Sequence, residues 1–353
     1  MVTPEEVVLA YRLILQRPPE SDEAIAHHLQ EEDPRSLGRT LMASAEFASR
    51  SAPAPGAHPH HVFPGYRPEE TALLARFRHA EGAGEAGFVT NFVGSRTRCR
   101  LQAQLAPFSG VVEEPPAPVG NTQAETAEWL GTLRAVEEAG AAFRMLELGA
   151  GYGPWMATTH RAARRRGVAD IRVYGVEGDE AHVGFIHVNM GDNGVRPDAY
   201  EAIHSAVGAR DGVAFWPVEE DSSAVYGGRP LAADDGGAAY LGQRRARLAE
   251  VPVLAIDRLL EREPFWDLVH IDIQGQEGEV CEAGVEQMTL RVRRVVVGTH
   301  SRVQDGRVMA VFHAAGWSLE NEKPTITVWN DAIPTVEGMA LVDGVQVWRN
   351  PRL

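Results

Sequence analysis

The chain has 353 residues and a net charge of −15, since 49 Asp and Glu residues outnumber 34 Lys and Arg residues. This length exceeds one average domain and can bury a sizeable core, while the acidic balance argues against a nucleic-acid partner, which would be bound through its phosphates. No run is apolar and long enough to cross a membrane and the first residues lack a signal-peptide pattern, so we expect a cytoplasmic protein without membrane insertion.

The first 50 residues predict a small helical module. An apolar face runs from Val7 to Leu15, Pro18-Pro19 ends that helix, and two further short helices are expected around 25–29 and 37–47. The run from Tyr11 onward, closing at Ser-Ala-Glu-Phe, resembles a helical module found beside bacterial surface-glycan enzymes. The resemblance implies a protein partner for residues 1–50; a plain helical extension packed on the main domain is the alternative.

Residues 51–66 predict a linker rich in Pro and His, and 67–120 an accessory region that could cap a site or form its entrance. Three linker histidines could bind a metal, but nothing in the pattern holds them in a fixed geometry. Arg96, in a Gly-Ser turn flanked by arginines, is the candidate for substrate contact, with an ordinary surface turn as the alternative.

From 121 to 353, strands and helices alternate, which predicts a parallel sheet with helices on both faces. Strands are expected near 143–148, 171–177, 201–207, 267–273 and 293–299. The tail predicts a closing antiparallel pair, and a Gly- and Asp-rich stretch between Pro217 and Glu250 predicts a flexible loop. Short basic clusters such as Arg164-Arg165-Arg166 are interpreted as solvated faces. The expected class is α/β, with a doubly wound Rossmann-like sheet and a C-terminal antiparallel hairpin.

A glycine-rich turn follows the first of these strands. Glu147 lies at the strand's end, and Gly149, Gly151 and Gly153 let the backbone turn sharply and approach a ligand at the start of a helix. The E-x-G-x-G-x-G spacing resembles that of class I S-adenosylmethionine (SAM) methyltransferases and differs from the G-x-G-x-x-G of dinucleotide-binding folds. The resemblance implies SAM as the cofactor, held by these four residues.

The next two strands supply further cofactor contacts. Glu177 ends the second strand, where a carboxylate can accept hydrogen bonds from both hydroxyls of a ribose. Ser205 and Ala206 end the third strand, whose carboxyl end borders the ligand crevice of a doubly wound sheet, so we expect them beside an adenine ring. A solvated acid at 177 and a simple bend at 205–206 are the alternatives.

Two titratable residues end the fourth and fifth strands. Asp272 and His300 should face one crevice, and we hypothesise that one of them deprotonates an acceptor hydroxyl while the other assists. Asp272, Glu277 and His300 could instead share a divalent metal ion.

The run Asp272-x-x-Gly275-x-Glu277 resembles the FkbM family of SAM-dependent methyltransferases over roughly residues 120–350. The resemblance implies O-methylation of a hydroxyl on a saccharide or glycosylated small molecule, with Glu277 near the substrate. Gln274 and Gln276 flank Gly275 where other members often differ.

Two other classes of function stay open. One is a non-catalytic binding module of the same fold, recruited to a glycan-assembly complex by its N-terminal helices. The other is a nucleotide-dependent dehydrogenase using NAD, which the glycine spacing disfavours.

Overall fold

The computed structural model describes residues 2–15, 17–44, 46, 65–79, 84–117, 120–231, 247–333 and 335–353. It divides into two compact units, residues 1–63 and 64–353. Residues 51–64 of the expected linker, which include its three histidines, lie outside the described residues. Phe47 and the 232–246 part of the expected loop also lie outside them. No helix within the described ranges is long and apolar enough to span a membrane.

The first unit holds three short helices, α1 (Pro4–Ile14), α2 (Asp22–His28) and α3 (Pro34–Met42). Each begins at a residue whose side chain accepts a hydrogen bond from the first turn, and these residues are Thr3, Ser21 and Asp33. α1 ends before the two prolines, as expected. Its buried face packs on α3 and forms a separate small core.

The second unit is built on a seven-stranded sheet in the order β11-β14-β10-β9-β3-β4-β5. Its strands are β3 (Ala142–Leu148), β4 (Asp170–Glu177), β5 (Tyr200–His204), β9 (Trp266–Ile271), β10 (Val292–Thr299), β11 (Ser318–Lys323) and β14 (Gly344–Arg349). Five of them, from β5 to β10, are parallel, and β14 runs antiparallel to both β10 and β11. A parallel sheet closed by a reversed strand is the class I methyltransferase fold, so the expected fold class is confirmed.

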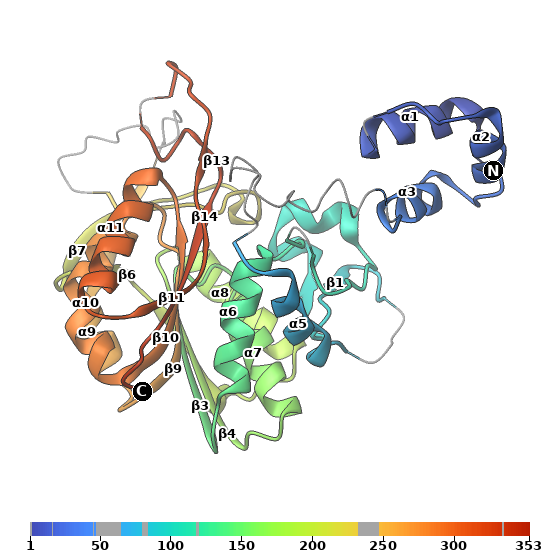
Figure 1. The fold of residues 1–353 in the computed structure, drawn as a ribbon. Helices are drawn as coiled ribbons and strands as arrows, with labels where there is room; N and C mark the ends of the chain where they lie inside the picture. The colour runs from blue at the N-terminus through green and yellow to red at the C-terminus, as the bar shows by residue number, and fades with distance from the viewer. Residues whose placement is uncertain are drawn as a thin grey trace. The chain divides into compact units, whose positions relative to one another are not determined.

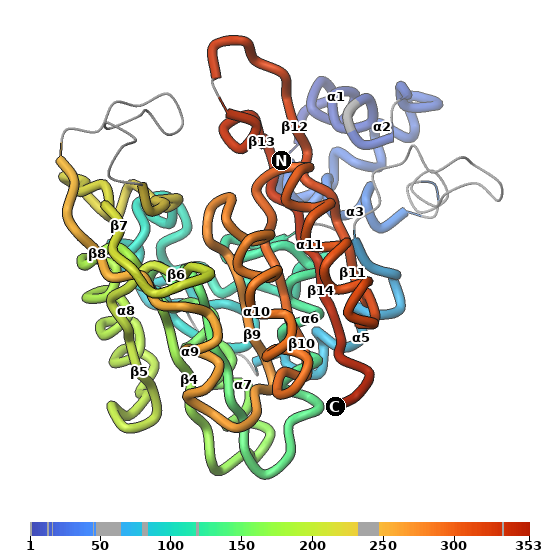
Figure 2. Tube along the Cα trace, turned by 90° about the vertical axis from the view of Figure 1, so that its left-hand side faces the viewer, coloured from blue at the N-terminus to red at the C-terminus, as the bar shows by residue number. Residues whose placement is uncertain are grey.

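Helices cover both faces of this sheet, as Figures 1 and 2 show. One face carries α6 (Thr126–Glu137), α7 (Pro154–Arg165) and α8 (Glu180–Asp192), and the other carries α9 (Ile256–Leu260), α10 (Glu277–Arg291) and α11 (Arg302–Ala314). All six residues of β9 are buried, because a central parallel strand is covered on both sides. The ends of these strands are therefore the places where polar side chains can face a cavity.

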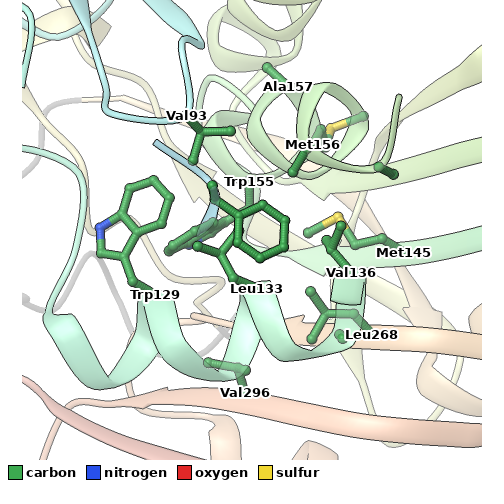
Figure 3. Packing of buried hydrophobic residues seen from close by; sticks show 14 of the residues in the cluster. Val93, Trp129, Leu133, Val136, Met145, Trp155, Met156, Ala157, Leu268 and Val296 are labelled. Carbon is green, nitrogen blue, oxygen red and sulfur yellow. The ribbon is translucent and has the colours of Figure 1, made fainter. Parts of the chain in front are cut away.

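Aromatic rings pack the core between α6, α7 and the sheet (Figure 3). Trp129 of α6 contacts Phe92 and Trp155, with ring centroids 4.6 and 4.7 Å apart. Phe92 comes from the 64–120 region, so this region is part of the second unit's core. That region also contains α5 (Ala72–Arg76), β1 (Phe88–Thr90) and β2 (Arg96–Arg98), with 3₁₀ helices at Pro68–Thr71, Cys99–Leu101 and Ala103–Phe108.

The expected third strand is interrupted. β5 ends at His204, and β6 (Ala206–Gly208) belongs to a separate three-stranded sheet with β8 (Leu248–Ala255) and β7 (Gly212–Pro217). The chain leaves the main sheet at Ser205, whose hydroxyl donates to the carbonyls of Ala206 and Pro252. The remaining elements are β12 (Ile326–Thr327), β13 (Ala340–Val342) and 3₁₀ helices at Pro197–Ala199 and Ser222–Ala224.

Candidate active site

The glycine turn adopts a backbone that other residues rarely reach. Gly149, Gly151 and Gly153 have φ values of +76°, +54° and +72°. At Gly149 a Cβ would lie 1.7 Å from the carbonyl oxygen of Asp272, so only glycine lets the ends of β3 and β9 come this close. Gly153 begins α7 as its N-terminal cap. The turn is thus both a ligand-facing loop and the joint between two strands.

Glu147 points into the first turn of α7. Its carboxylate accepts from the amide nitrogens of Met156 at 2.9 Å and Trp155 at 3.4 Å, in the position where a helix N-terminus favours an acid. The side chain is buried, and burial raises its pKa to about 8. Glu147 therefore fixes the first turn of α7, the helix that follows the glycine turn. Glu147 also lines the larger of two cavities that adjoin this turn.

A small cavity of about 120 Å³ lies at the carboxyl ends of β3 and β4, where a nucleoside was expected. Gly149, Gly151, Glu177, Ser205 and Ala206 all line it. The Glu177 carboxylate accepts from the amides of Gly151 at 2.7 Å and Asp179 at 2.8 Å, so the strand-end acid is held in one orientation. The structure thus brings these five predicted residues together.

Aromatic side chains that the sequence did not single out cover this cavity. Trp216 packs over Gly178 and Gly228, where a Cβ would lie 2.3 and 2.8 Å from its ring. Tyr226 stacks on His182 with a centroid distance of 4.3 Å and an interplanar angle of 5°. The Tyr226 hydroxyl donates to the carbonyl of Leu101 in the 64–120 region. The pair Gly227-Gly228 directly after Tyr226 is the available signal in the sequence.

A larger cavity of about 610 Å³ adjoins the first. Gly149, Gly151, Tyr226 and Asp272 line both, so the ring of Tyr226 stands at their boundary. The smaller cavity alone is below the roughly 300–1,000 Å³ of ligand pockets, whereas the two together fall within that range. An elongated ligand of nucleoside size would have to extend from one cavity into the other.

His300 lies between two carboxylates. Its Nδ1 is 2.8 Å from Glu277 and its Nε2 is 3.3 Å from Asp272. Although burial opposes the charged imidazolium, Asp272 and Glu277 raise the pKa of His300 to about 10. This pKa favours the charged imidazolium of His300 at neutral pH, which makes His300 the weaker candidate for the base.

The Asp272 carboxylate lies on the floor of the larger cavity. It is surrounded by protein, yet 43% of its side-chain surface is open to the cavity. Burial raises its pKa to about 6, and the neighbouring His300 limits that rise. Asp272 is thus mostly ionised at neutral pH and can accept a proton. The sequence alone does not decide which of Asp272 and His300 would deprotonate the acceptor.

The donor set does not fit a shared metal ion. Asp272 and Glu277 contact opposite nitrogens of the His300 ring, so the three side chains do not converge on one point. Among the described residues, no group of three or more His, Cys, Asp and Glu has a geometry that could hold a metal. The three residues form an ion-pair network instead.

A second buried histidine lies at the back of the larger cavity. His270 Nε2 is 2.7 Å from Glu128, which also accepts from the indole nitrogen of Trp155 at 3.0 Å. Glu128 raises the pKa of His270 against the opposing effect of burial. Glu128 escaped sequence reasoning because one acid in an amphipathic helix carries no signal of its own.

Comparison with known proteins decides the family. No family model matches the chain. A protein of Jannaschia sp. (strain CCS1) named "Putative methyltransferase" is 32% identical over 276 residues, which cover 78% of this chain and 96% of that protein. The chain belongs to the methyltransferases.

Solved structures of methyltransferases are similar at lower identity. The FkbM methyltransferase of Methylobacillus flagellatus KT is 9% identical, with 65% of this chain and 56% of that chain covered and a TM-score of 0.37. The O-methyltransferase of Bacillus cereus, in complex with SAH, is 13% identical, with 67% and 84% covered and a TM-score of 0.34. Neither likeness bears on the substrate.

Neither predicted substrate residue of this methyltransferase lines a cavity, since Glu277 is buried beside His300 and Arg96 lies elsewhere. Arg96 pairs with Glu85 and donates to the carbonyl of Asp192 at 3.3 Å, at the C-terminal end of α8. It lines neither of the two cavities. Its role as a substrate contact is not supported, because the Gly-Ser turn packs against α8 instead of the carboxyl edge of the sheet.

Proposed function

We propose that this methyltransferase uses SAM to methylate a hydroxyl of a saccharide or glycosylated small molecule, as its sequence resemblance to the FkbM family implies. The observation that carries the proposal is that Asp272 lines both cavities, so a carboxylate with a pKa of about 6 faces the junction between the expected cofactor space and the open acceptor space.

The residues around the smaller cavity suit a nucleoside cofactor. Glu177 would accept from ribose hydroxyls, Ser205 and Ala206 would contact the adenine, and the glycine turn would lie along the rest of the molecule. When bound, SAM supplies an electrophilic methyl group.

Asp272 would remove the proton of the acceptor. As the bond between the acceptor oxygen and the methyl carbon forms and the bond between sulfur and methyl breaks, the hydroxyl proton passes to the Asp272 carboxylate. The imidazolium of His300, fixed by Glu277 on its other side, orients that carboxylate. His300 is thus a positioning residue, and Asp272 is the proposed base.

The larger cavity has the chemistry of a site for a polyol. Residues with amide and hydroxyl side chains line its wall next to the carboxylates, and these are Gln102, Thr122 and Gln123. Such groups both donate and accept, as a neutral sugar hydroxyl does. This lining favours an oxygen acceptor over an apolar one.

The first test is calorimetric titration with S-adenosylhomocysteine (SAH). We expect saturable binding by the wild type and a loss of about tenfold or more in Glu177→Ala, because hydrogen bonds to a charged group contribute about 1.5–3 kcal/mol. Glu180→Gln is the matched control, since this neighbouring acid lines neither cavity. A folded wild type that does not bind SAH would overturn the proposal.

The second test is methyl transfer from SAM to a panel of mono- and oligosaccharides, with the methylated atom located by mass spectrometry and NMR. Asp272→Asn should lower kcat by about 10²–10⁴-fold and leave SAH affinity nearly unchanged. Normal turnover by this variant would remove Asp272 from the mechanism. Methylation of nitrogen or carbon only would refute the hydroxyl acceptor.

A further inference from the structure

A basic cavity of about 670 Å³ lies on the opposite edge of the sheet from the site above. It is formed by the second half of α7, the first residues of β4 and the connection that leads into β5. The arginines lining it are Arg161, Arg164, Arg165, Arg172 and Arg196. We propose that this basic cavity binds a small molecule that carries two or more phosphate groups.

The cations of the basic cavity outnumber its acids. The two carboxylates in its wall, Asp170 and Asp198, are already paired, Asp170 with Arg144 at 2.6 Å and Asp198 with Arg196. Of the remaining arginines, Arg172 makes a long ion pair with Glu263, at 3.8 Å, and Arg165 donates to the carbonyl of Val93. An acidic protein thus gathers an excess of positive charge in one hollow.

Arg161 is the central observation. It is half-buried, its Nε is shielded from solvent without a hydrogen-bond partner, and no carboxylate among the described residues pairs with it. Burial and the neighbouring Arg165 and Arg96 lower its pKa. A charge held among like charges without a counter-ion is unfavourable, so the protein maintains a guanidinium for which an external anion would be the missing partner.

The five arginines in the wall favour an anion over a metal cation. His79 contacts Arg165 at 3.0 Å, and burial lowers the pKa of His160 to about 4, so the positive charge of the basic cavity comes from its arginines. Several guanidinium groups around a concave space match phosphate oxygens, which accept paired N–H donors. The volume exceeds that of a single phosphate and suits an organic bisphosphate or a diphosphate.

The sequence interpretation of this region as a solvated face holds only in part. Arg164 and Arg165 are exposed, but together with the half-buried Arg161 they line the basic cavity, whereas Arg166 does not. Periodicity alone could not separate Arg161 from a surface arginine, because its surroundings come from β4, from 194–199 and from His79.

The test is calorimetric titration of the full chain with inorganic pyrophosphate and with fructose 1,6-bisphosphate. Arg161→Gln and Arg164→Gln remove charges of the basic cavity, and Arg166→Gln is the matched control because it lies on the same helix end outside the cavity. We expect both ligands to bind Arg166→Gln as tightly as they bind the wild type. We expect both to bind Arg161→Gln at least tenfold more weakly. A stronger response to the bisphosphate would indicate an organic phosphate, and an equal response the inorganic one.

Thermal unfolding provides a second readout. Without ligand, Arg161→Gln should melt at a higher temperature than the wild type, because an uncompensated charge has been removed. With pyrophosphate, only proteins that bind it should gain stability. No binding by the folded wild type at low ionic strength, or equal losses in Arg161→Gln and Arg166→Gln, would overturn the proposal. SAH binding is measured independently, so either proposal can fail alone.

Discussion

At the scale of single residues, His300 is a strongly perturbed group of the site. It is 7% exposed and carries a charge because Glu277 and Asp272 contact its two ring nitrogens. The same contacts that orient Asp272 therefore also link the protonation of His300 to the stability of the fold.

This linkage gives a pH dependence with a definite sign. The pKa of His300 rises from 6.5 in the unfolded chain to about 10 in the fold, so its stabilising contribution is complete below pH 6.5 and is lost as the pH rises to 10. Over that window we expect the free energy of unfolding of the wild type to fall relative to His300→Gln, by up to about 1.4 kcal/mol per pH unit. Urea denaturation of both proteins from pH 6 to 10 measures this, and parallel profiles would contradict it.

At the scale of elements, the sequence predicted most of the sheet. β3, β4, β9 and β10 are mostly buried and rich in apolar residues, and a polar residue stands at or beside the carboxyl end of each. That is why Glu177 and Asp272 could be placed before the structure was known. The closing antiparallel strands β11 and β14 lie in the tail, where the sequence predicts an antiparallel pair.

Features that depend on contacts between distant segments could not be predicted. The break at Ser205 depends on a carbonyl of Pro252, 47 residues away. Tyr226 lies in a Gly- and Asp-rich stretch that predicts only a loop, and its hydroxyl finds Leu101, 125 residues away. His300 was considered a possible base because the sequence could not show that carboxylates contact both of its nitrogens.

The 222–231 segment makes a second prediction possible. Tyr226 lines both cavities, and we expect a ligand that occupies both to displace its ring and break its hydrogen bond to Leu101. Tyr226→Phe lacks that bond, so we expect it to bind SAH about fivefold more tightly, which corresponds to about 1 kcal/mol. Titration calorimetry of the two proteins decides. Weaker binding would mean that the hydroxyl contacts the bound ligand.

At the scale of the whole molecule, both carboxyl-edge cavities belong to the second unit. All described residues that line the two carboxyl-edge cavities fall between 102 and 345. We therefore expect the chain truncated to 64–353 to bind SAH with a Kd within about twofold of the full chain, since each unit has its own core. A tenfold loss in the truncated chain would show that the first unit contributes to the site.

The contact between Gly149 and the carbonyl of Asp272 has a consequence for sequence divergence. Because no side chain fits between them, any replacement at 149 would push β9 away from β3 and carry the Asp272 carboxylate with it. Position 149 is therefore constrained twice, by backbone conformation and by the geometry of the reaction. Distant descendants of this protein can exchange the residues around the proposed acceptor, but losing this glycine would disturb the glycine turn and the proposed base in a single step.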